Sequence, residues 1–263
     1  MLLTSVVLIL REVLEAALII SVLLAMSYTR ALGNSWLAWA VGLGLAGAVT
    51  YAMNISTVSD WFDGVGQEVV NAFMQLVLYV LLVAFAILTS RMRASEPGRV
   101  RTLYILMMVS VALAITREGS EIMIYLASFT QSLDQFTPIL TGGLVGLGLG
   151  LSVGAITYYA LLSLRQRLLP HLCSIVLAVV AAGLAGQAAQ LLIQADWLPA
   201  QRALWDTSAW IPEDSLPGQL LYALVGYEAT PTPLQAGIYF ITLLVPLCLL
   251  ALFATRRGLT RAA

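Results

Sequence analysis

The chain has 263 residues, of which 60% are hydrophobic and only 10% are charged, and its formal net charge at pH 7 is −1. A water-soluble domain of this length could not cover its surface with so few polar side chains, so the composition excludes that class. Long apolar runs without strand-like alternation predict an all-α, polytopic membrane protein, because only helices and closed barrels satisfy the backbone in lipid. We expect a lipid bilayer around the chain and no nucleic-acid partner.

The apolar runs predict seven transmembrane helices. In chain order they lie at about 2–28, 36–54, 65–90, 102–128, 138–163, 172–194 and 234–255. The first run carries charged residues and lacks the basic leader of a signal peptide, so we interpret it as a retained span.

Arginine alone decides the predicted orientation, because the chain has no lysine. Arginines follow the first, third, fifth and seventh predicted helices, whereas the other connectors are acidic and hold a single basic residue, Arg202. By the positive-inside rule the N-terminus is outside and the C-terminus is cytoplasmic. The arginines on the cytoplasmic side are Arg30, Arg91, Arg93, Arg99, Arg101, Arg165, Arg167, Arg256, Arg257 and Arg261.

An Arg-Glu-x-x-Glu pattern occurs twice, in the first and fourth predicted helices, as the segments 11–15 and 117–121. Each charged residue at mid-membrane depth costs about 2.5–3.5 kcal/mol, even on a lenient insertion scale. These side chains must therefore face one another, water or an ion.

The two copies of the pattern lie on helices that run in opposite directions, which predicts an inverted repeat of three plus three helices. Glycines on the second helix of each triplet predict close helix packing there. We expect a single membrane domain over 1–263. It comprises repeat one at about 1–91, repeat two at about 101–195, an external loop at about 195–233 and a seventh helix at about 234–255. The glycines are Gly42, Gly44, Gly47, Gly142, Gly146, Gly150 and Gly154.

Each motif places its three charges on one helical arc of about 100°. Two facing arcs form an anionic, oxygen-rich cage of the kind that binds a hard cation. We expect cross-helix ion pairs of Arg11 with Glu121 and of Arg117 with Glu15, and we expect Glu12 and Glu118 to meet near the middle. The predicted metal ligands are Glu12, Glu15, Glu118 and Glu121, with Arg11 and Arg117 as supporting charges.

The third helix of each triplet carries a polar stripe with spacing i, i+3, i+7. Both stripes are predicted in the outer halves of their spans, where they would line a vestibule; the alternative is hydrogen bonding between helices. The stripe residues are Glu68, Asn71, Gln75, Gln187, Gln190 and Gln194. The long connector at about 195–233 either caps the outer surface or docks a partner.

The motifs resemble the hallmark Arg-Glu-Gly-x-Glu of the oxidase-dependent iron permeases of fungal plasma membranes and bacterial inner membranes. Val13 replaces the usual glycine in the first copy, and Asn71 stands where the family commonly has glutamate. Similarity extends to the segments 66–68, 194–199, 204–207, 218–221 and 226–227. The resemblance implies iron uptake at a bacterial inner membrane. It also implies oxidation of ferrous iron by a separate protein, either a multicopper ferroxidase or a periplasmic haem peroxidase with a metal-binding partner.

The sequence thus predicts a permease and not an enzyme. Iron, ferric after oxidation by the partner, is its transported substrate, and no cofactor is bound permanently. A permease for another hard or borderline cation, such as manganese or lead, stays open, as does a metal sensor. An intramembrane di-iron enzyme also stays open, although such sites use two histidines and the chain has only His171. The sequence leaves a homo-oligomer open.

Overall fold

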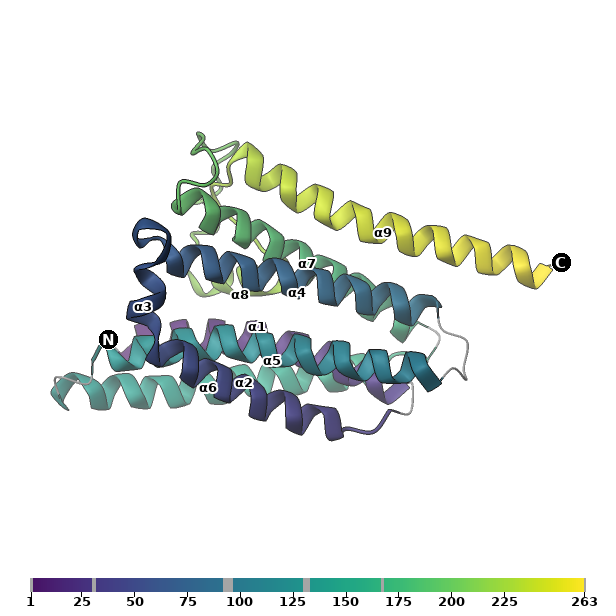
Figure 1. The fold of residues 1–263 in the computed structure, drawn as a ribbon, viewed down its shortest axis with the longest axis horizontal. Coiled ribbons are helices and arrows are strands. Elements are labelled where there is room, and N and C mark those ends of the chain that lie inside the picture. Colours follow the sequence, from purple (N-terminus) through teal and green to yellow (C-terminus); the bar gives the residue numbers. More distant parts are fainter. Residues whose placement is uncertain (1, 30–31, 92–96, 130–132, 167, 263) are drawn as a thin grey trace.

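The computed structural model of the protein describes residues 2–29, 32–91, 97–129, 133–166 and 168–262, and within these ranges every regular element is a helix (Figure 1). Three arginines of the orientation argument, Arg30, Arg93 and Arg167, lie outside the described residues. The long helices are α1 (Leu2–Thr29), α2 (Ser35–Met53), α4 (Gly66–Arg91), α5 (Pro97–Ala127), α6 (Leu133–Leu162), α7 (Leu169–Gln194) and α9 (Pro233–Ala262). They match the seven predicted helices in order, with ends that differ by at most seven residues, the largest difference being at the end of α9.

Among the described residues, six helices are long and apolar enough to cross a membrane, namely α2, α4, α5, α6, α7 and α9. Helix α1, which carries the first charged motif, is not among the six. The N-terminus, the connector between α2 and α4, and the connector between α7 and α9 lie at one end of the bundle, and the C-terminus lies at the other (Figure 1). We call the first of these ends the N-terminal end.

Two close helix pairs depend on glycine: α1 packs against α6, and α2 packs against α5. A Cβ atom added to Gly146 would lie only 2.6 Å from the Val6 carbonyl oxygen, and one added to Gly44 would lie 2.9 Å from that of Ala112. These glycines therefore permit backbone contact between helices, as their spacing predicts. Gly42 has no neighbour of this kind and does not belong to the packing ridge.

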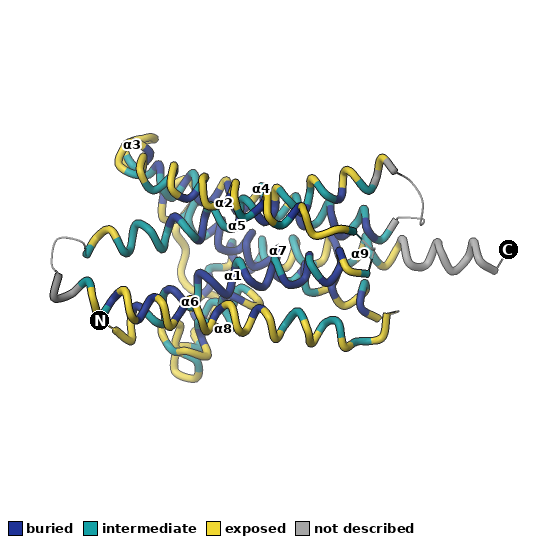
Figure 2. Tube along the Cα trace, turned by 90° about the horizontal axis from the view of Figure 1, so that it is seen from below, coloured by how far each residue is buried: buried dark blue, intermediate teal, exposed yellow. Residues whose placement is uncertain are grey.

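The half of the bundle away from the N-terminal end contains an extensive apolar core. It is formed by the second halves of α1 and α4, the first halves of α5 and α7, and the start of α2. Figure 2 shows buried residues concentrated along the central helices, while the outer helices expose one face. The fully buried large side chains of this core include Leu23, Met26, Trp36, Leu82, Phe85, Leu103 and Met107.

The connector between α7 and α9 contains a helix that the sequence reading did not predict, α8 (Leu216–Val225). Ser215 caps its start by accepting a hydrogen bond from the Gly218 backbone N–H (3.2 Å), and Gly226 ends it in a left-handed conformation with φ 67°. Helix α8 packs against α1 and α7, so the connector folds back onto the bundle as a cap.

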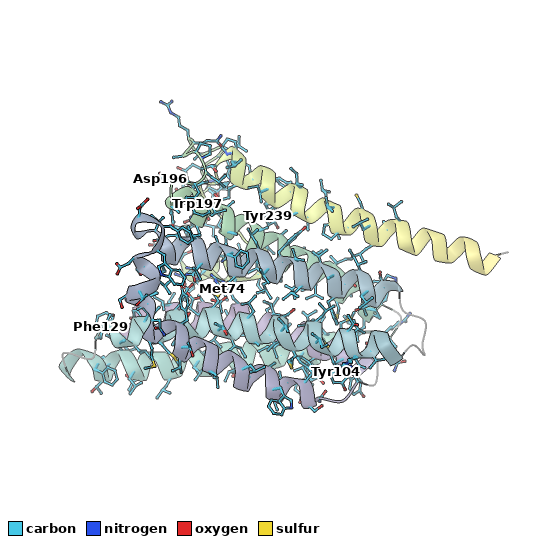
Figure 3. The ribbon with its side chains drawn as sticks, viewed as in Figure 1. Met74, Tyr104, Phe129, Asp196, Trp197 and Tyr239 are labelled. Carbon is cyan, nitrogen blue, oxygen red and sulfur yellow. The ribbon has the colours of Figure 1, made fainter. Side chains whose placement is uncertain are left out.

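The α2–α4 connector contains helix α3 (Ile55–Ser59) and a 3₁₀ turn (Trp61–Gly64). Phe62 of this turn meets Trp197 edge to face, with 5.5 Å between ring centroids, at the end of the molecule where Figure 3 labels Trp197. The two connectors therefore contact each other at the N-terminal end.

Candidate cation site

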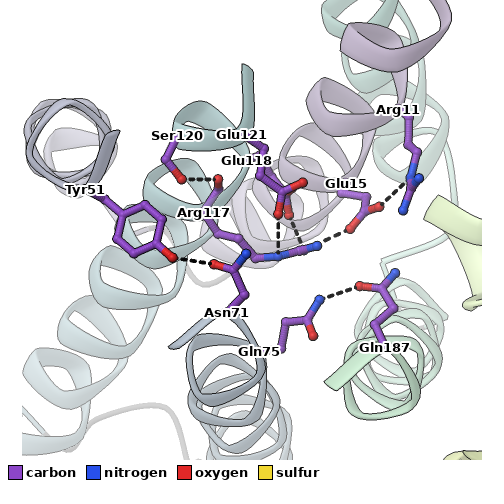
Figure 4. Close-up of polar contacts among 10 residues, drawn as sticks. All are labelled: Arg11, Glu15, Tyr51, Asn71, Gln75, Arg117, Glu118, Ser120, Glu121 and Gln187. Carbon is purple, nitrogen blue, oxygen red and sulfur yellow. Dashed lines mark hydrogen bonds and ion pairs between the residues drawn. The ribbon is translucent and has the colours of Figure 1, made fainter. Parts of the chain in front are cut away.

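The two charged motifs meet where the apolar core ends, because α1 and α5 pack against each other at this level. Each motif presents its charges on one face of its helix, and the close-up in Figure 4 shows the two faces turned toward each other. The site thus lies between the apolar half of the bundle and the polar half toward the N-terminal end.

Arg117 is the centre of the charge network and is only 4% exposed. Its Nη1 atom donates to Glu15 Oε2 on α1 at 3.1 Å and to Glu118 Oε1 at 2.5 Å. Its Nε atom lies 3.6 Å from Glu121 Oε1. The predicted cross-helix pair of Arg117 with Glu15 is therefore present, and one guanidinium is shared by three carboxylates (Figure 4).

The predicted pair of Arg11 with Glu121 is wrong for this structure. Among the described ion pairs, Arg11 contacts Glu15 on its own helix, with 3.6 Å between Nε and Oε1. Its guanidinium carbon lies 3.9 Å from the centroid of the Tyr222 ring on α8. The reason is that α8 places an aromatic face beside α1, and this cation–π contact holds Arg11 to that side.

Three glutamates converge as a potential ligand set. Carboxylate oxygens of Glu12, Glu118 and Glu121 lie within 4.8 Å of one another. The Oε2 atoms of Glu12 and Glu118 are buried and receive no hydrogen bond from a donor group, and the two carboxyl groups lie within hydrogen-bond reach of each other. Glu12 and Glu118 thus meet as expected, whereas Glu15 is engaged by the two arginines and is not one of the three. Unpartnered buried carboxylate oxygens are costly, and a bound cation would satisfy them.

The six residues of the polar stripes line two cavities on the N-terminal side of the motifs. One cavity has a volume of about 270 Å³ and the other about 390 Å³, and Glu121, 30% exposed, lines both. The stripes also bond between helices, since Gln75 Nε2 donates to Gln187 Oε1 (2.8 Å) and Tyr51 donates to Asn71 Oδ1 (3.2 Å). The first cavity is lined by Gln75, Gln187, Gln190 and Gln194, and the second by Glu68, Asn71 and Gln194.

Four residues of the capping connector also line the 270 Å³ cavity, and sequence reasoning missed them: Glu213, Gln219, Tyr222 and Glu228. The sequence does contain a local signal for the helix that carries two of them. Ser215 before an apolar run and Gly226 after it mark a short helix, which would have placed polar side chains of the connector against the bundle.

The apolar helices, together with a charged cluster buried between them, define a multi-pass membrane protein with an ionisable site between its helices. The model of the iron permease FTR1 family matches residues 51–257, and the chain belongs to this family.

Curated relatives align with this chain over most of their own length and over most of this chain. A "Ferrous iron permease EfeU" of Escherichia coli O6:H1 is 28% identical over an alignment of 271 positions, gaps included, which covers 96% of each chain. The protein of the same name from Yersinia pestis is 29% identical over 258 aligned positions, which cover 91% of this chain and 89% of its own. A "Putative inactive ferrous iron permease EfeU" of E. coli K12 is 27% identical over 260 aligned positions, which cover 92% of this chain and 93% of its own. No solved structure matches the chain.

Proposed function

We propose that the protein imports iron across a bacterial inner membrane through Glu12, Glu15, Glu118 and Glu121, with Arg11 and Arg117 balancing their charge. The main support for this proposal is the convergence of Glu12, Glu118 and Glu121, in which the buried Oε2 atoms of Glu12 and Glu118 receive no hydrogen bond from a donor group. Such a site is unfavourable when empty and becomes favourable when a cation enters. The polar stripes serve as the vestibule on the entry side.

The iron that passes this site is ferric, produced from ferrous iron by a separate ferroxidase or haem peroxidase with its metal-binding protein. The ligand chemistry supports this assignment, because the set of three described carboxylates holds no histidine or cysteine and hard oxygen donors suit a hard cation. The relatives are named ferrous iron permeases, which agrees with ferrous iron as the species supplied to such a system.

We further propose that all seven long helices span the membrane as an inverted repeat of three plus three, with α9 outside the repeat. The packing pattern supports this: α1 pairs with α6, α2 with α5, and α4 with α7. A two-fold axis in the membrane plane would exchange the first two pairs and map the third onto itself. The arginine distribution supports an external N-terminus and a cytoplasmic C-terminus.

Radiolabelled iron uptake into proteoliposomes tests the proposal. Because Glu12→Gln and Glu118→Gln each remove one negative ligand without changing shape, we expect each to lower uptake by more than about tenfold, since losing even an outer hydrogen-bond partner of a metal ligand costs that much. Asp214→Asn is the matched control, because Asp214 is an exposed carboxylate of the connector that lines neither cavity.

Uptake that persists in both glutamate variants would contradict the proposal. Iron should be supplied once as ferrous iron with a reductant and once as a ferric chelate, with manganese and lead as competitors. Uptake of ferrous iron alone would overturn the ferric assignment, and preferred uptake of manganese or lead would replace iron as the substrate.

A further inference from the structure

Glu228 brings a negative charge from the capping connector into the cavity that leads to the motifs. It lines the 270 Å³ cavity together with Glu213, and Glu121 lines the same space from α5. Neither Glu213 nor Glu228 belongs to a charged motif or to a polar stripe, so the site described above leaves both without a role.

The backbone around Glu228 is pinned to the bundle. Gly226 packs so tightly on Gly183 of α7 that a Cβ atom on Gly226 would clash with the Gly183 Cα atom, and its φ of 67° suits glycine. The Ala229 backbone N–H donates to Glu213 Oε1 at 2.7 Å, which holds the Glu213 side chain beside the Glu228 segment. These contacts therefore fix the positions of the Glu213 and Glu228 side chains relative to the bundle.

The hydrogen bonds to Glu228 are long. Gln190 Nε2 lies 3.5 Å from its Oε1 atom, and Gln235 Nε2 lies 3.4 Å from its Oε2 atom. Burial raises the pKa of Glu228 to about 7, and the like charge of Glu213 adds to the effect. The cavity thus contains a half-buried carboxylate on which burial and the neighbouring Glu213 outweigh the opposing positive charge of Arg11.

Gln75 provides an independent sign of a ligand. It is 1% exposed and lines the same cavity, and its Oε1 atom is buried without a hydrogen-bond partner. Its Nε2 atom donates to Gln187 Oε1 at 2.8 Å, and in this orientation the Oε1 atom is left without a partner. An amide oxygen left unsatisfied in a polar cavity is an available cation ligand.

The cavity is large enough for a hydrated ion. Its 270 Å³ correspond to roughly nine waters at about 30 Å³ each, which exceeds the six-water shell of a typical metal cation. Arg11 and Arg117 also line the cavity. The Arg11 guanidinium is held against Tyr222 and Glu15 at one wall, and Arg117 contacts three carboxylates of the motifs. A cation in the cavity therefore meets carboxylate and amide oxygens, while both arginines are already paired with carboxylates.

We propose that Glu213, Glu228 and Gln75 form a second cation-binding site, which holds a hydrated, oxygen-preferring metal ion before it reaches Glu121 and the motifs. The order of the two sites rests on the proposed function, whereas the existence of the second site does not. Glu121 connects them, since it lines the cavity and belongs to the inner ligand set.

Terbium luminescence on the purified full-length protein tests the second site directly. Tb³⁺ prefers oxygen ligands, and Tyr222 in the cavity wall can sensitise its emission. In a Glu12→Gln/Glu118→Gln background, which disables the inner site, we expect saturable emission to remain. Adding Glu213→Gln and Glu228→Gln should abolish it, whereas adding Asp214→Asn should leave it unchanged. Glu228→Asp retains the carboxylate and should keep saturable terbium binding. This result would show that the loss of emission in the glutamine variants comes from the missing carboxylates and not from a failure to fold.

A terbium titration that is the same with and without Glu213→Gln/Glu228→Gln would overturn the second site. In transport, Glu228→Gln alone should raise the KM for iron by about tenfold with little change in maximal rate. An unchanged KM in this variant would contradict the role of Glu228 in delivering the ion to the motifs. If uptake instead persists in the Glu12→Gln variant while the terbium result holds, the proposed function fails and the second site stands.

Discussion

At the scale of single residues, the two arginines of the motifs have different surroundings although their sequence positions match. Arg117 is buried and contacts three carboxylates, while the Arg11 side chain is 31% exposed and has one carboxylate and one aromatic ring. Removing one partner of a buried ion pair leaves an uncompensated charge and costs about 3–5 kcal/mol, whereas exposed pairs contribute about 1 kcal/mol or less.

We therefore expect Arg117→Met to lower the stability of the protein far more than Arg11→Met. The measurement is the temperature at which half of the detergent-solubilised protein is lost from the monodisperse peak in size-exclusion chromatography. Adding Glu15→Gln to Arg117→Met should recover part of the loss, because one of the stranded charges is then removed. Equal effects of the two arginine substitutions would contradict the asymmetry.

At the scale of the helices, the contact between α1 and α6 depends on a ridge of small residues. Gly146 faces the α1 backbone, where an added Cβ atom would lie 2.6 Å from the Val6 carbonyl oxygen and 3.0 Å from the Leu10 nitrogen. Gly148, two residues further along the same helix, has nothing within 4 Å of such an atom. The same helix thus offers a contact glycine and a matched free one.

Gly146→Ala should destabilise the protein by about 1–3 kcal/mol, because backbone atoms cannot move aside as a flexible side chain can. Gly148→Ala should be neutral or slightly stabilising, since alanine restricts the unfolded chain without a clash. Thermal melting of both variants in the same detergent gives the comparison, and a loss of stability in Gly148→Ala equal to that in Gly146→Ala would refute the ridge.

At the scale of the whole molecule, polar cavities and apolar core occupy opposite halves of the bundle. The cavities are lined by the start of α4, the ends of α5 and α7, and α8, whereas the core fills the other half. The two motifs lie between these halves. The structure therefore corresponds to a form in which the charged site is reached from the N-terminal end and closed from the other end.

A membrane-impermeant thiol reagent should distinguish the two halves. In a background with Cys173 and Cys248 replaced by alanine, Gln194→Cys should react when the reagent is added to the outer face of intact spheroplasts, because Gln194 lines both cavities. Leu82→Cys should stay unmodified, because Leu82 is 0% exposed in the core. Rapid labelling of Leu82→Cys would show that the half of the bundle filled by the apolar core is open to the reagent. Labelling of Gln194→Cys only from the cytoplasmic face would reverse the proposed orientation.

Much of this arrangement follows from local patterns that need no tertiary structure. Apolar runs predicted the long helices, because helix formation in lipid depends on the segment's own hydrogen bonds. The repeated Arg-Glu-x-x-Glu pattern predicted that the charges of α1 and α5 face one another, since charge inside a membrane requires a partner. The pairing of Arg117 with Glu15 and the meeting of Glu12 with Glu118 followed from antiparallel geometry alone.

Only the tertiary structure decided which groups Arg11 contacts and how the connector between α7 and α9 packs on the bundle. Helix α8 is a short segment whose position depends on contacts with α1 and α7, and it draws Arg11 to Tyr222 instead of Glu121. The same segment brings Glu228 to the cavity beside Gln75. The spacing of residues along one helix determines which side chains share a face, but the meeting of a connector with a distant helix depends on how all the packed surfaces fit together.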